Sequence, residues 1–217
     1  METDNMLIAS YNPAGMGDVL VVLTAPAAEH TFEQKENVVR IADEQNMTLG
    51  FNFLHASTML DLPETAGQVF LTSDAVAKLN AVLVAAGFEA ELVADETPKF
   101  VVGYVEKAEP HPDSDHLQIT TTVVDNDERV QIVSGSPNMR QGIKVVVAKV
   151  GAMMPSGLII WPGALRGVAS NGMITSGREL RLPNAPQVPG ALILPDDFAE
   201  VGTPFDASSA EAQALFQ

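Results

Sequence analysis

The feature that most constrains the fold is a series of short strand-like segments after residue 98. They are rich in β-branched residues, and glycine or proline separates them at regular intervals. Five segments are clear: "KFVVGYVEKAE", "HLQITTTVV", "ERVQIVSG", "IKVVVAKVG" and "NGMITS". A sixth, "GALILP", is shorter. Five short antiparallel strands without a long helix predict a small barrel, and the OB-fold has that strand count.

The preceding residues have a different pattern. Four segments have the length and turn punctuation of strands: "MLIAS", "DVLVVLTA", "NVVRIAD" and "LGFNFLHAS". A helix follows in "TSDAVAKLNAVLVAAGF", where Thr72 or Ser73 is a suitable N-cap and Val76, Leu79 and Leu83 share one face. This combination of strands and one helix predicts an α+β domain.

A domain boundary is expected at "VADETPKF", an acidic link that contains a proline and precedes a new apolar run. The predicted α+β domain then covers residues 1–97, and the predicted all-β, five-stranded OB-fold domain covers residues 98–217. The apolar content of 46% is sufficient for two small cores.

Composition also limits the compartment and the chemistry. The chain has no cysteine, which excludes disulfides, thiolate zinc sites and cysteine nucleophiles and is usual in a reducing compartment. Its first residues, "METDNMLIAS", are acidic where a signal peptide would be basic, and the apolar run "VLVVL" is too short for a membrane span. We therefore expect a cytoplasmic protein with no membrane partner.

Charges are distributed unevenly along the chain, whose net charge is −16. Residues 1–98 contain three bases and fifteen acids, whereas residues 129–181 contain seven bases and a single acid, Glu179. Neutralisation of phosphates supplies most nucleic-acid affinity, so the whole chain is unfavourable for such a partner while the basic segment is favourable. Either this segment meets an anionic partner or its bases are scattered over the surface.

The stretch "HPDSDHLQI" places His111, Asp113, Asp115 and His116 within six residues, which raises the question of a metal site. Pro112 favours extended backbone at the preceding residue, and the x-Pro-Asp-Ser sequence is typical of a turn. No histidine pair at helical spacing supports a metal site. We expect a turn that leads into a strand, and no metal.

Alternation in the strand that follows predicts two different faces. One face carries Leu117, Ile119, Thr121 and Val123, and the other carries His116, Gln118, Thr120 and Thr122. Side chains alternate across a strand, so the second, polar face is expected to meet solvent or a ligand.

Three blocks of the C-terminal half resemble a known family. "HPDSDHLQI" is similar to a His-Pro-x-Ala-Asp-Lys-Leu motif, "QIVSGSPNMRQGIKVVVAKVGAMMPSG" to an Ile-Val-Cys-Gly-Ala-Pro-Asn segment with its following strand, and "ALRGVASNGMITSGREL" to a Leu-Arg-Gly-Val-x-Ser-x-Gly-Met-x-x-Ser signature. These motifs belong to the tRNA-binding OB domain of bacterial phenylalanyl-tRNA synthetase β chains, methionyl-tRNA synthetase extensions and endothelial monocyte-activating polypeptide II. The N-terminal domain, up to "TPKFVVGY", is similar to that of free-standing tRNA-binding proteins of the YtpR type.

The resemblance implies a non-enzymatic protein that recognises folded tRNA through a basic OB-fold face, without metal or cofactor. The RNA-binding residues it implies are His116, Asn138, Lys144, Arg166, Ser170, Asn171, Met173 and Ser176. Arg140 and Lys149 are weaker candidates, and Trp161 could stack a base or cover the end of the barrel. Further partners to consider are an aminoacyl-tRNA synthetase and a second copy of the chain, as a homodimer.

Three positions depart from the family pattern. His116 replaces a lysine, and Ser134 and Thr175 replace frequent cysteines. An imidazole that is mostly uncharged at pH 7 removes a phosphate contact, so we expect this change to lower RNA affinity rather than alter the fold. Serine and threonine keep the small size of cysteine and can donate hydrogen bonds.

Two other functions stay open at this point. A protein-interaction adaptor for a synthetase or translation factor would show no RNA binding that depends steeply on salt. A metal-dependent hydrolase built on the His/Asp cluster would lose activity in chelator. No catalytic residues are expected, because Ser134 and Ser136 have no neighbouring histidine in the sequence.

Overall fold

The computed structural model describes residues 6–26, 29–64 and 66–217. The chain divides into two compact units, Met1–Thr97 and Pro98–Gln217. None of the helices in these described ranges is long and apolar enough to cross a membrane.

The N-terminal unit is built on one antiparallel sheet of six strands in the order β3-β4-β5-β2-β1-β6. The strands are β1 (Ile8–Tyr11), β2 (Val19–Leu23), β3 (Thr31–Lys35), β4 (Val38–Ala42), β5 (Thr48–Leu54) and β6 (Gly67–Val69). Leu20 is paired with Phe53 and Val22 with Phe51, and all four are fully buried. Because side chains alternate across each strand, this register gives the sheet one continuous apolar face.

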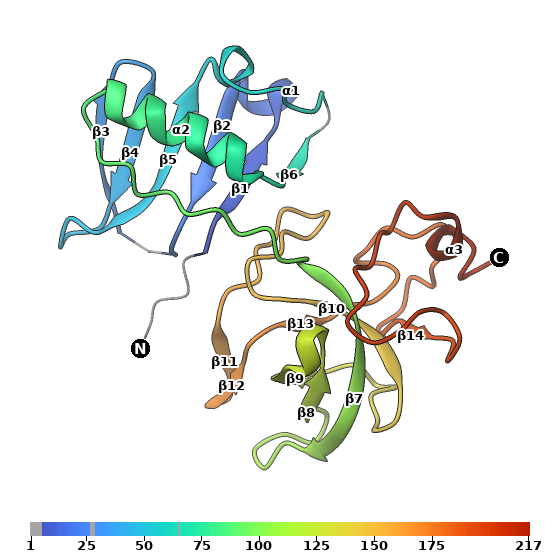
Figure 1. The fold of residues 1–217 in the computed structure, drawn as a ribbon. Helices are drawn as coiled ribbons and strands as arrows, with labels where there is room; N and C mark the ends of the chain where they lie inside the picture. The colour runs from blue at the N-terminus through green and yellow to red at the C-terminus, as the bar shows by residue number, and fades with distance from the viewer. Residues whose placement is uncertain (1–5, 27–28, 65) are drawn as a thin grey trace. The chain divides into compact units, whose positions relative to one another are not determined.

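Helix α2 (Ser73–Ala85) covers that apolar face (Figure 1). The Thr72 hydroxyl accepts a hydrogen bond from the backbone N–H of Ala75, which caps the first turn. The helix residues Val76, Leu79 and Leu83 are buried in the core. These observations confirm the predicted helix, its N-cap and its buried face.

The N-terminal unit is mostly sheet rather than a balanced α+β domain, which corrects the predicted class. Strands β3 and β6 were not predicted, and both lie at edges of the sheet. Most of β3 is exposed, so its sequence "TFEQK" lacks the apolar alternation of a half-buried strand. The "NPAGM" turn forms one short helix, α1 (Pro13–Met16), and η1 (Ala56–Thr58) is a single 3₁₀ turn.

The C-terminal unit contains a five-stranded sheet in the order β13-β10-β7-β8-β9. Its strands are β7 (Phe100–Pro110), β8 (Gln118–Val123), β9 (Arg129–Ser134), β10 (Lys144–Ala148) and β13 (Met173–Ile174), and β14 (Ile193–Leu194) also pairs with β10. Val133 donates its N–H to the Ser170 hydroxyl, and Asn171 donates its N–H to the carbonyl of Gln131. These bonds bring β9 close to the start of β13, so the sheet forms a nearly closed barrel, as the sequence predicts.

Strand β7 is long enough to pair on both sides. Its first half pairs with β10 and its second half with β8, with a register shift between Val105 and Lys107. A Cβ atom at Gly103 would lie 2.6 Å from a methyl group of Val147, so only glycine fits this crowded position. The bulge and the glycine let the strand bend around the barrel.

The polar face of β8 points inward, contrary to the sequence prediction. Thr120 and Thr122 are fully buried, whereas Ile119, Thr121 and Val123 are only partly buried. The Thr120 hydroxyl donates to the carbonyl of Ile132 at 2.9 Å and lies 3.0 Å from the Thr122 hydroxyl. Because these hydroxyls are satisfied inside the barrel, threonine is tolerated where an apolar residue was expected.

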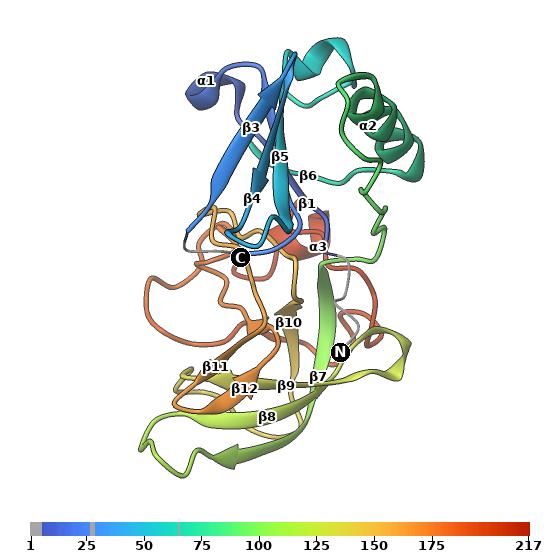
Figure 2. The same cartoon turned by 90° about the vertical axis from the view of Figure 1, so that its left-hand side faces the viewer.

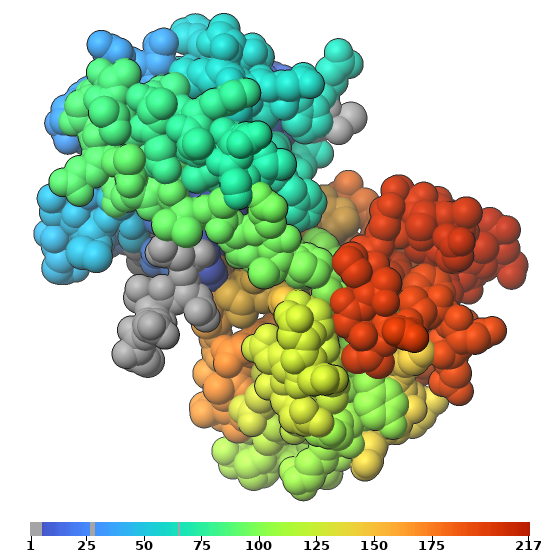
Figure 3. Space-filling model, in the orientation of Figure 1, coloured from blue at the N-terminus to red at the C-terminus, as the bar shows by residue number. Residues whose placement is uncertain are grey.

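The last forty residues pack against the outside of the barrel. Leu180, Leu192 and Phe205 share a buried cluster with Val102 and Val146 of the barrel strands. The segment ends in helix α3 (Ala210–Gln213), and Figure 3 shows it as a compact mass, coloured orange-red to red, beside the barrel strands. The C-terminal unit therefore consists of a barrel with a packed C-terminal extension.

Candidate nucleic-acid interface

A two-stranded hairpin that the sequence did not predict stands next to the barrel. It consists of β11 (Gly163–Leu165) and β12 (Val168–Ser170) and lies beside β9, as Figure 2 shows. Arg166 and Gly167 form its turn with φ angles of 45° and 82°. Two consecutive positive φ angles are typical of a tight hairpin turn, and they leave the Arg166 side chain exposed at the tip.

The "HPDSDHL" turn packs against the tip of this hairpin. Arg166 donates from Nη1 to the carbonyl of Asp113 at 2.6 Å. His111 is buried, accepts the N–H of Asp113 at Nδ1, and has Nε2 at 3.3 Å from the carbonyl of Leu165. The acceptor role of Nδ1 assigns the ring proton to Nε2, so both ring nitrogens hold backbone groups in place. His111 is therefore a structural residue that joins the first and third family blocks.

His116 lies at the exposed end of the same turn. Its Nδ1 is 2.9 Å from a carboxylate oxygen of Asp115, and its side chain is 63% exposed. The hydrogen bond from His116 is the main cause that lowers the pKa of Asp115, and the charge of Arg166 contributes to the same shift. His116 and Arg166 thus belong to one exposed, polar end of the unit.

A groove opens between the hairpin, the end of β9 and β13, with a volume of about 490 Å³. Its lining combines apolar side chains, serine hydroxyls and one charge of each sign. The lining includes the polar, charged and large apolar side chains of Ser134, Trp161, Ser170, Met173, Ser176, Arg178 and Glu179. A concave site with apolar walls and a few polar groups is typical of ligand-binding pockets.

Three of the predicted RNA-binding residues line this groove. Met173 is partly buried there, while Ser170 and Ser176 are buried and their hydroxyls already have partners. The Ser170 hydroxyl accepts the N–H of Val133 at 3.1 Å, and the Ser176 hydroxyl donates to a carboxylate oxygen of Glu179 at 2.6 Å. Because both hydroxyl groups are already hydrogen-bonded within the protein, Ser170 and Ser176 determine the shape of the groove and are not free donors for a ligand.

The two predicted asparagines have different environments. The side-chain amide of Asn138 bonds both backbone groups of Ala191, at 2.9 Å to its carbonyl and 2.8 Å from its N–H. Asn171 is exposed, and its backbone N–H contacts the carbonyl of Gln131. Asn138 thus holds the C-terminal extension to the barrel, whereas the Asn171 side chain is accessible to a ligand.

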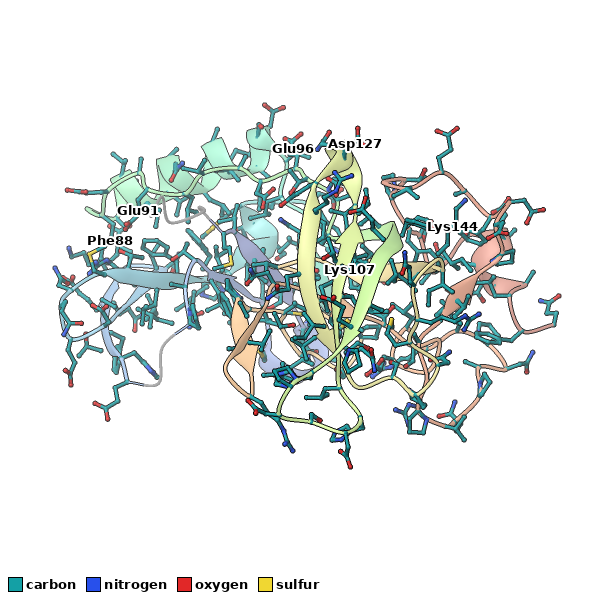
Figure 4. All side chains as sticks on the ribbon, turned by 90° about the horizontal axis from the view of Figure 1, so that it is seen from below. Phe88, Glu91, Glu96, Lys107, Asp127 and Lys144 are labelled. Carbon is teal, nitrogen blue, oxygen red and sulfur yellow. The ribbon has the colours of Figure 1, made fainter. Side chains whose placement is uncertain are left out.

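Lys144 lies next to the C-terminal extension (Figure 4) and is not among the residues that line the groove. Its Nζ donates to the carbonyls of Asp196 and Ala199, at 2.5 and 2.7 Å. Two backbone carbonyls at these distances satisfy most of the donors of one ammonium group. A phosphate contact by Lys144 would require breaking these bonds.

Two further bases of the basic segment are neutralised by acids outside it. Arg129 forms a bidentate pair with Glu106, at 3.0 and 2.9 Å, which raises the pKa of Arg129 and lowers that of Glu106. Lys149 Nζ lies 2.8 Å from both carboxylate oxygens of Asp125. The charge of the segment is therefore much smaller in the folded protein than the sequence suggests.

The remaining cations are arginines. Within the part of the chain that the structure describes, no ion pair joins Arg140, Arg166, Arg178 or Arg181 to a carboxylate, and all four are exposed. Arg178 lines the groove, and Arg166 is at the hairpin tip next to the groove residue Leu165. The sequence analysis did not identify Arg178 and Glu179 as groove residues, and it left two roles open for Trp161. Glu179 could have been singled out because it is the one acid in the basic segment 129–181.

The described residues contain no group of three or more histidine, aspartate or glutamate side chains arranged to hold a metal ion. Both ring nitrogens of His111 face backbone groups, which leaves neither free as a ligand. The absence of a metal site stays a prediction.

Comparison with known proteins agrees with the division into two units. Residues 100–204 match the family model described as "Putative tRNA binding domain". Residues 25–95 match a second model, described as "Domain of unknown function (DUF4479)".

One relative matches nearly the whole chain. The "Putative tRNA-binding protein YtpR" of Bacillus subtilis (strain 168) is 46% identical over 200 residues, which cover 91% of this chain and 98% of that protein. This chain belongs to the YtpR family. The alignment with that protein therefore spans both the N-terminal unit and the C-terminal unit of this chain.

Other relatives of this YtpR-family chain are much longer proteins. The phenylalanine–tRNA ligase beta subunit of Neisseria meningitidis is 43% identical over 143 residues, and that of Idiomarina loihiensis is 48% identical over 128 residues. These alignments cover 64% and 58% of this chain but only 18% and 16% of the subunits. The similarity is thus to one part of the ligase subunits.

Proposed function

We propose that the C-terminal unit is an OB-fold domain that binds tRNA without catalysing a reaction. The observation that carries the proposal is that the three family blocks contact one another. His111 and Arg166 join the first block to the third at the hairpin tip, and Val133 joins the second to the third through Ser170 at the groove. Membership of the YtpR family and the tRNA-binding domain model support the same conclusion.

The proposed contact surface is narrower than the one implied by the sequence. Phosphates need cations that no carboxylate neutralises, and Arg166 and Arg178 meet that condition at the border of the groove. Arg166 gives one donor to the carbonyl of Asp113 and keeps the others of its guanidinium group. His116 adds an exposed side chain at the end that carries Arg166, and Asn171 adds an exposed amide at the base of the hairpin, after β12. Ser170, Met173 and Ser176 line the groove. Asn138 and Lys144 act by holding the C-terminal extension in place.

Recognition of folded RNA fits this surface better than coating of single strands. Proteins that coat single strands use a series of aromatic side chains, whereas the groove has Trp161 as its one aromatic residue. The groove-lining residues include no histidine that could activate one of the serines, which supports a non-catalytic role. A role with tRNA implies a cytoplasmic location.

The experiment is an anisotropy titration of the full chain with bulk tRNA, single-stranded RNA and duplex DNA at two salt concentrations. We expect the tightest binding for tRNA, weakening steeply as salt increases because phosphate contacts release counterions. Equal, weak binding of all three nucleic acids would contradict the proposal. Capture of a synthetase or translation factor in that case would establish the adaptor function instead.

A further inference from the structure

The groove contains a carboxylate that a simple phosphate-binding surface does not need. Glu179 is the single acid between residues 129 and 181, and it lines the groove. A negative charge there repels phosphate, so the group that enters next to Glu179 must carry hydrogen-bond donors instead.

Glu179 is held in a fixed orientation by Ser176. Its Oε2 atom accepts both the backbone N–H and the hydroxyl of Ser176, at 2.8 and 2.6 Å, and its own N–H donates to the Ser176 hydroxyl at 3.2 Å. This reciprocal pair has the hydrogen-bond pattern of a capping box, here around a turn instead of at the start of a helix. The other oxygen, Oε1, accepts no hydrogen bond from any residue that the structure describes, so it remains available as an acceptor.

The other groups at the groove fit a nucleobase. Trp161, Ile160 and Met173 provide apolar surface against which a planar ring can lie. Arg178 is exposed beside Glu179, where it can contact the phosphate of the same nucleotide. The groove volume of about 490 Å³ accommodates one base with its ribose.

We propose that this groove binds one unstacked guanine of the RNA, with Glu179 Oε1 accepting hydrogen bonds from its N1–H and N2–H groups. Guanine has two adjacent N–H donors on its Watson–Crick edge. Uracil has one such donor between two carbonyl oxygens, which a carboxylate repels, and adenine and cytosine place a ring acceptor next to their amino group. The inference rests on the proposed function and adds a base preference to it.

The sole tryptophan of the chain makes the groove directly observable. Fluorescence of Trp161 in the full chain is followed during titration with the tetranucleotides UUGU, UUUU and UUIU, in which inosine lacks the N2 amino group. We expect UUGU to bind at least about tenfold more tightly than UUUU, with UUIU between them. Equal affinities for UUGU and UUUU would overturn the inference.

Glu179→Gln is the matched variant, because its amide oxygen can still accept the hydrogen bonds from Ser176. It turns a donor group toward the groove, so the preference for UUGU over UUUU should disappear while the melting temperature changes little. Retention of the full preference would mean that Glu179 does not read the base. If the variant fails to fold, the unaltered chain still tests the inference through UUGU and UUIU. Weaker binding of UUIU supports the guanine pocket, and equal affinities of UUGU and UUIU contradict a contact to the N2 amino group.

A parallel titration with bulk tRNA separates this inference from the proposed function. Steeply salt-dependent tRNA binding together with equal tetranucleotide affinities would leave the function in place and overturn only the guanine pocket. Failure of the full chain to bind tRNA at low salt would overturn both.

Discussion

Lys149 Nζ lies 2.8 Å from both carboxylate oxygens of Asp125, and the two side chains are only 17% and 12% exposed. This pair fixes the 3₁₀ turn η2 (Asp125–Asp127) near the end of β10. A lysine held this way is a structural residue, although the sequence makes it look like a phosphate ligand.

The first prediction follows from that pair. Lys149→Met should lower the free energy of unfolding by an amount between the roughly 1 kcal/mol of an exposed pair and the roughly 3–5 kcal/mol of a fully buried one. It should leave tRNA affinity nearly unchanged. Thermal denaturation and tRNA titration of the same variant check both parts, and a large loss of affinity in a stable variant would contradict the assignment.

A second prediction concerns His111, whose ring joins the two turns through backbone contacts at 3.0 and 3.3 Å. His111→Ala removes a buried side chain and the partner of two partly buried backbone groups, the N–H of Asp113 and the carbonyl of Leu165, so it should destabilise the protein by roughly 1–3 kcal/mol. Chelator should leave the melting temperature of the unaltered chain unchanged, and elemental analysis should find no stoichiometric metal. About one metal per chain, lost in His111→Ala, would contradict the binding-module account.

The third prediction uses the pH dependence of stability in the N-terminal unit. Asp18 accepts hydrogen bonds from the hydroxyl and N–H of Ser57 and from the hydroxyl of Tyr11, and the Ser57 hydroxyl is the main cause that lowers the pKa of Asp18. A depressed folded-state pKa stabilises the protein above the unfolded-state pKa, and this contribution is lost as pH falls through the folded-state value.

Asp18→Asn should therefore be less stable than the unaltered chain at pH 7. The difference should shrink as pH falls below about 4, where the unfolded-state aspartate begins to bind protons. Melting temperatures measured from pH 7 to pH 2 check this expectation. A difference that is constant over the whole range would show that the charge of Asp18 does not contribute.

The fourth prediction follows from the acidic N-terminal unit. Residues 1–98 contribute a net charge of −12, from three bases and fifteen acids. A fragment that begins at Pro98 should bind tRNA more tightly than the full chain at low salt, and the difference should decrease toward about 0.15 M salt, where the Debye length is about 8 Å. Weaker binding by the fragment would mean that the N-terminal unit contributes contacts of its own.

The barrel was predictable because its strands carry strong local signals. All five predicted strands correspond to strands of the sheet, and α2 has the predicted cap and buried face. The edge strands β3 and β6 and the hairpin β11–β12 escaped prediction because they are short or exposed, so alternation of apolar residues does not mark them.

The inward face of β8 shows a different limit of sequence reasoning. Alternation correctly divides Thr120 and Thr122 from Ile119, but it cannot tell which set is buried when both contain threonine. The outcome depends on the carbonyl of Ile132, which accepts the Thr120 hydroxyl from the neighbouring strand.

The sequence motifs identified the segments that form the candidate site, but they did not identify which of its side chains are accessible to a ligand and which hold the fold together. Arg166, Lys144 and Lys149 look alike in the sequence, yet their partners differ. Arg166 is exposed and gives one of its five donors to the carbonyl of Asp113, whereas the two lysines are held by Asp196, Ala199 and Asp125. Those partners are distant in the sequence, so no local sequence pattern predicts these contacts. This long-range pairing decides which cations remain for a ligand.

The most direct test compares two arginine variants that change the net charge equally. Arg166 is exposed at the hairpin tip without a carboxylate partner among the described residues, whereas Arg129 is paired with Glu106 at 2.9 Å. Salt-dependent tRNA titrations are carried out on the full chain, Arg166→Ala and Arg129→Ala, after each variant has been shown to be folded.

We predict that Arg166→Ala weakens tRNA binding by roughly 1 kcal/mol or more and lowers the slope of log K against log salt by about one unit, while Arg129→Ala changes little. Equal effects of the two variants would mean that only total charge matters. Unchanged affinity and slope in Arg166→Ala would contradict the claim that this end of the barrel binds tRNA.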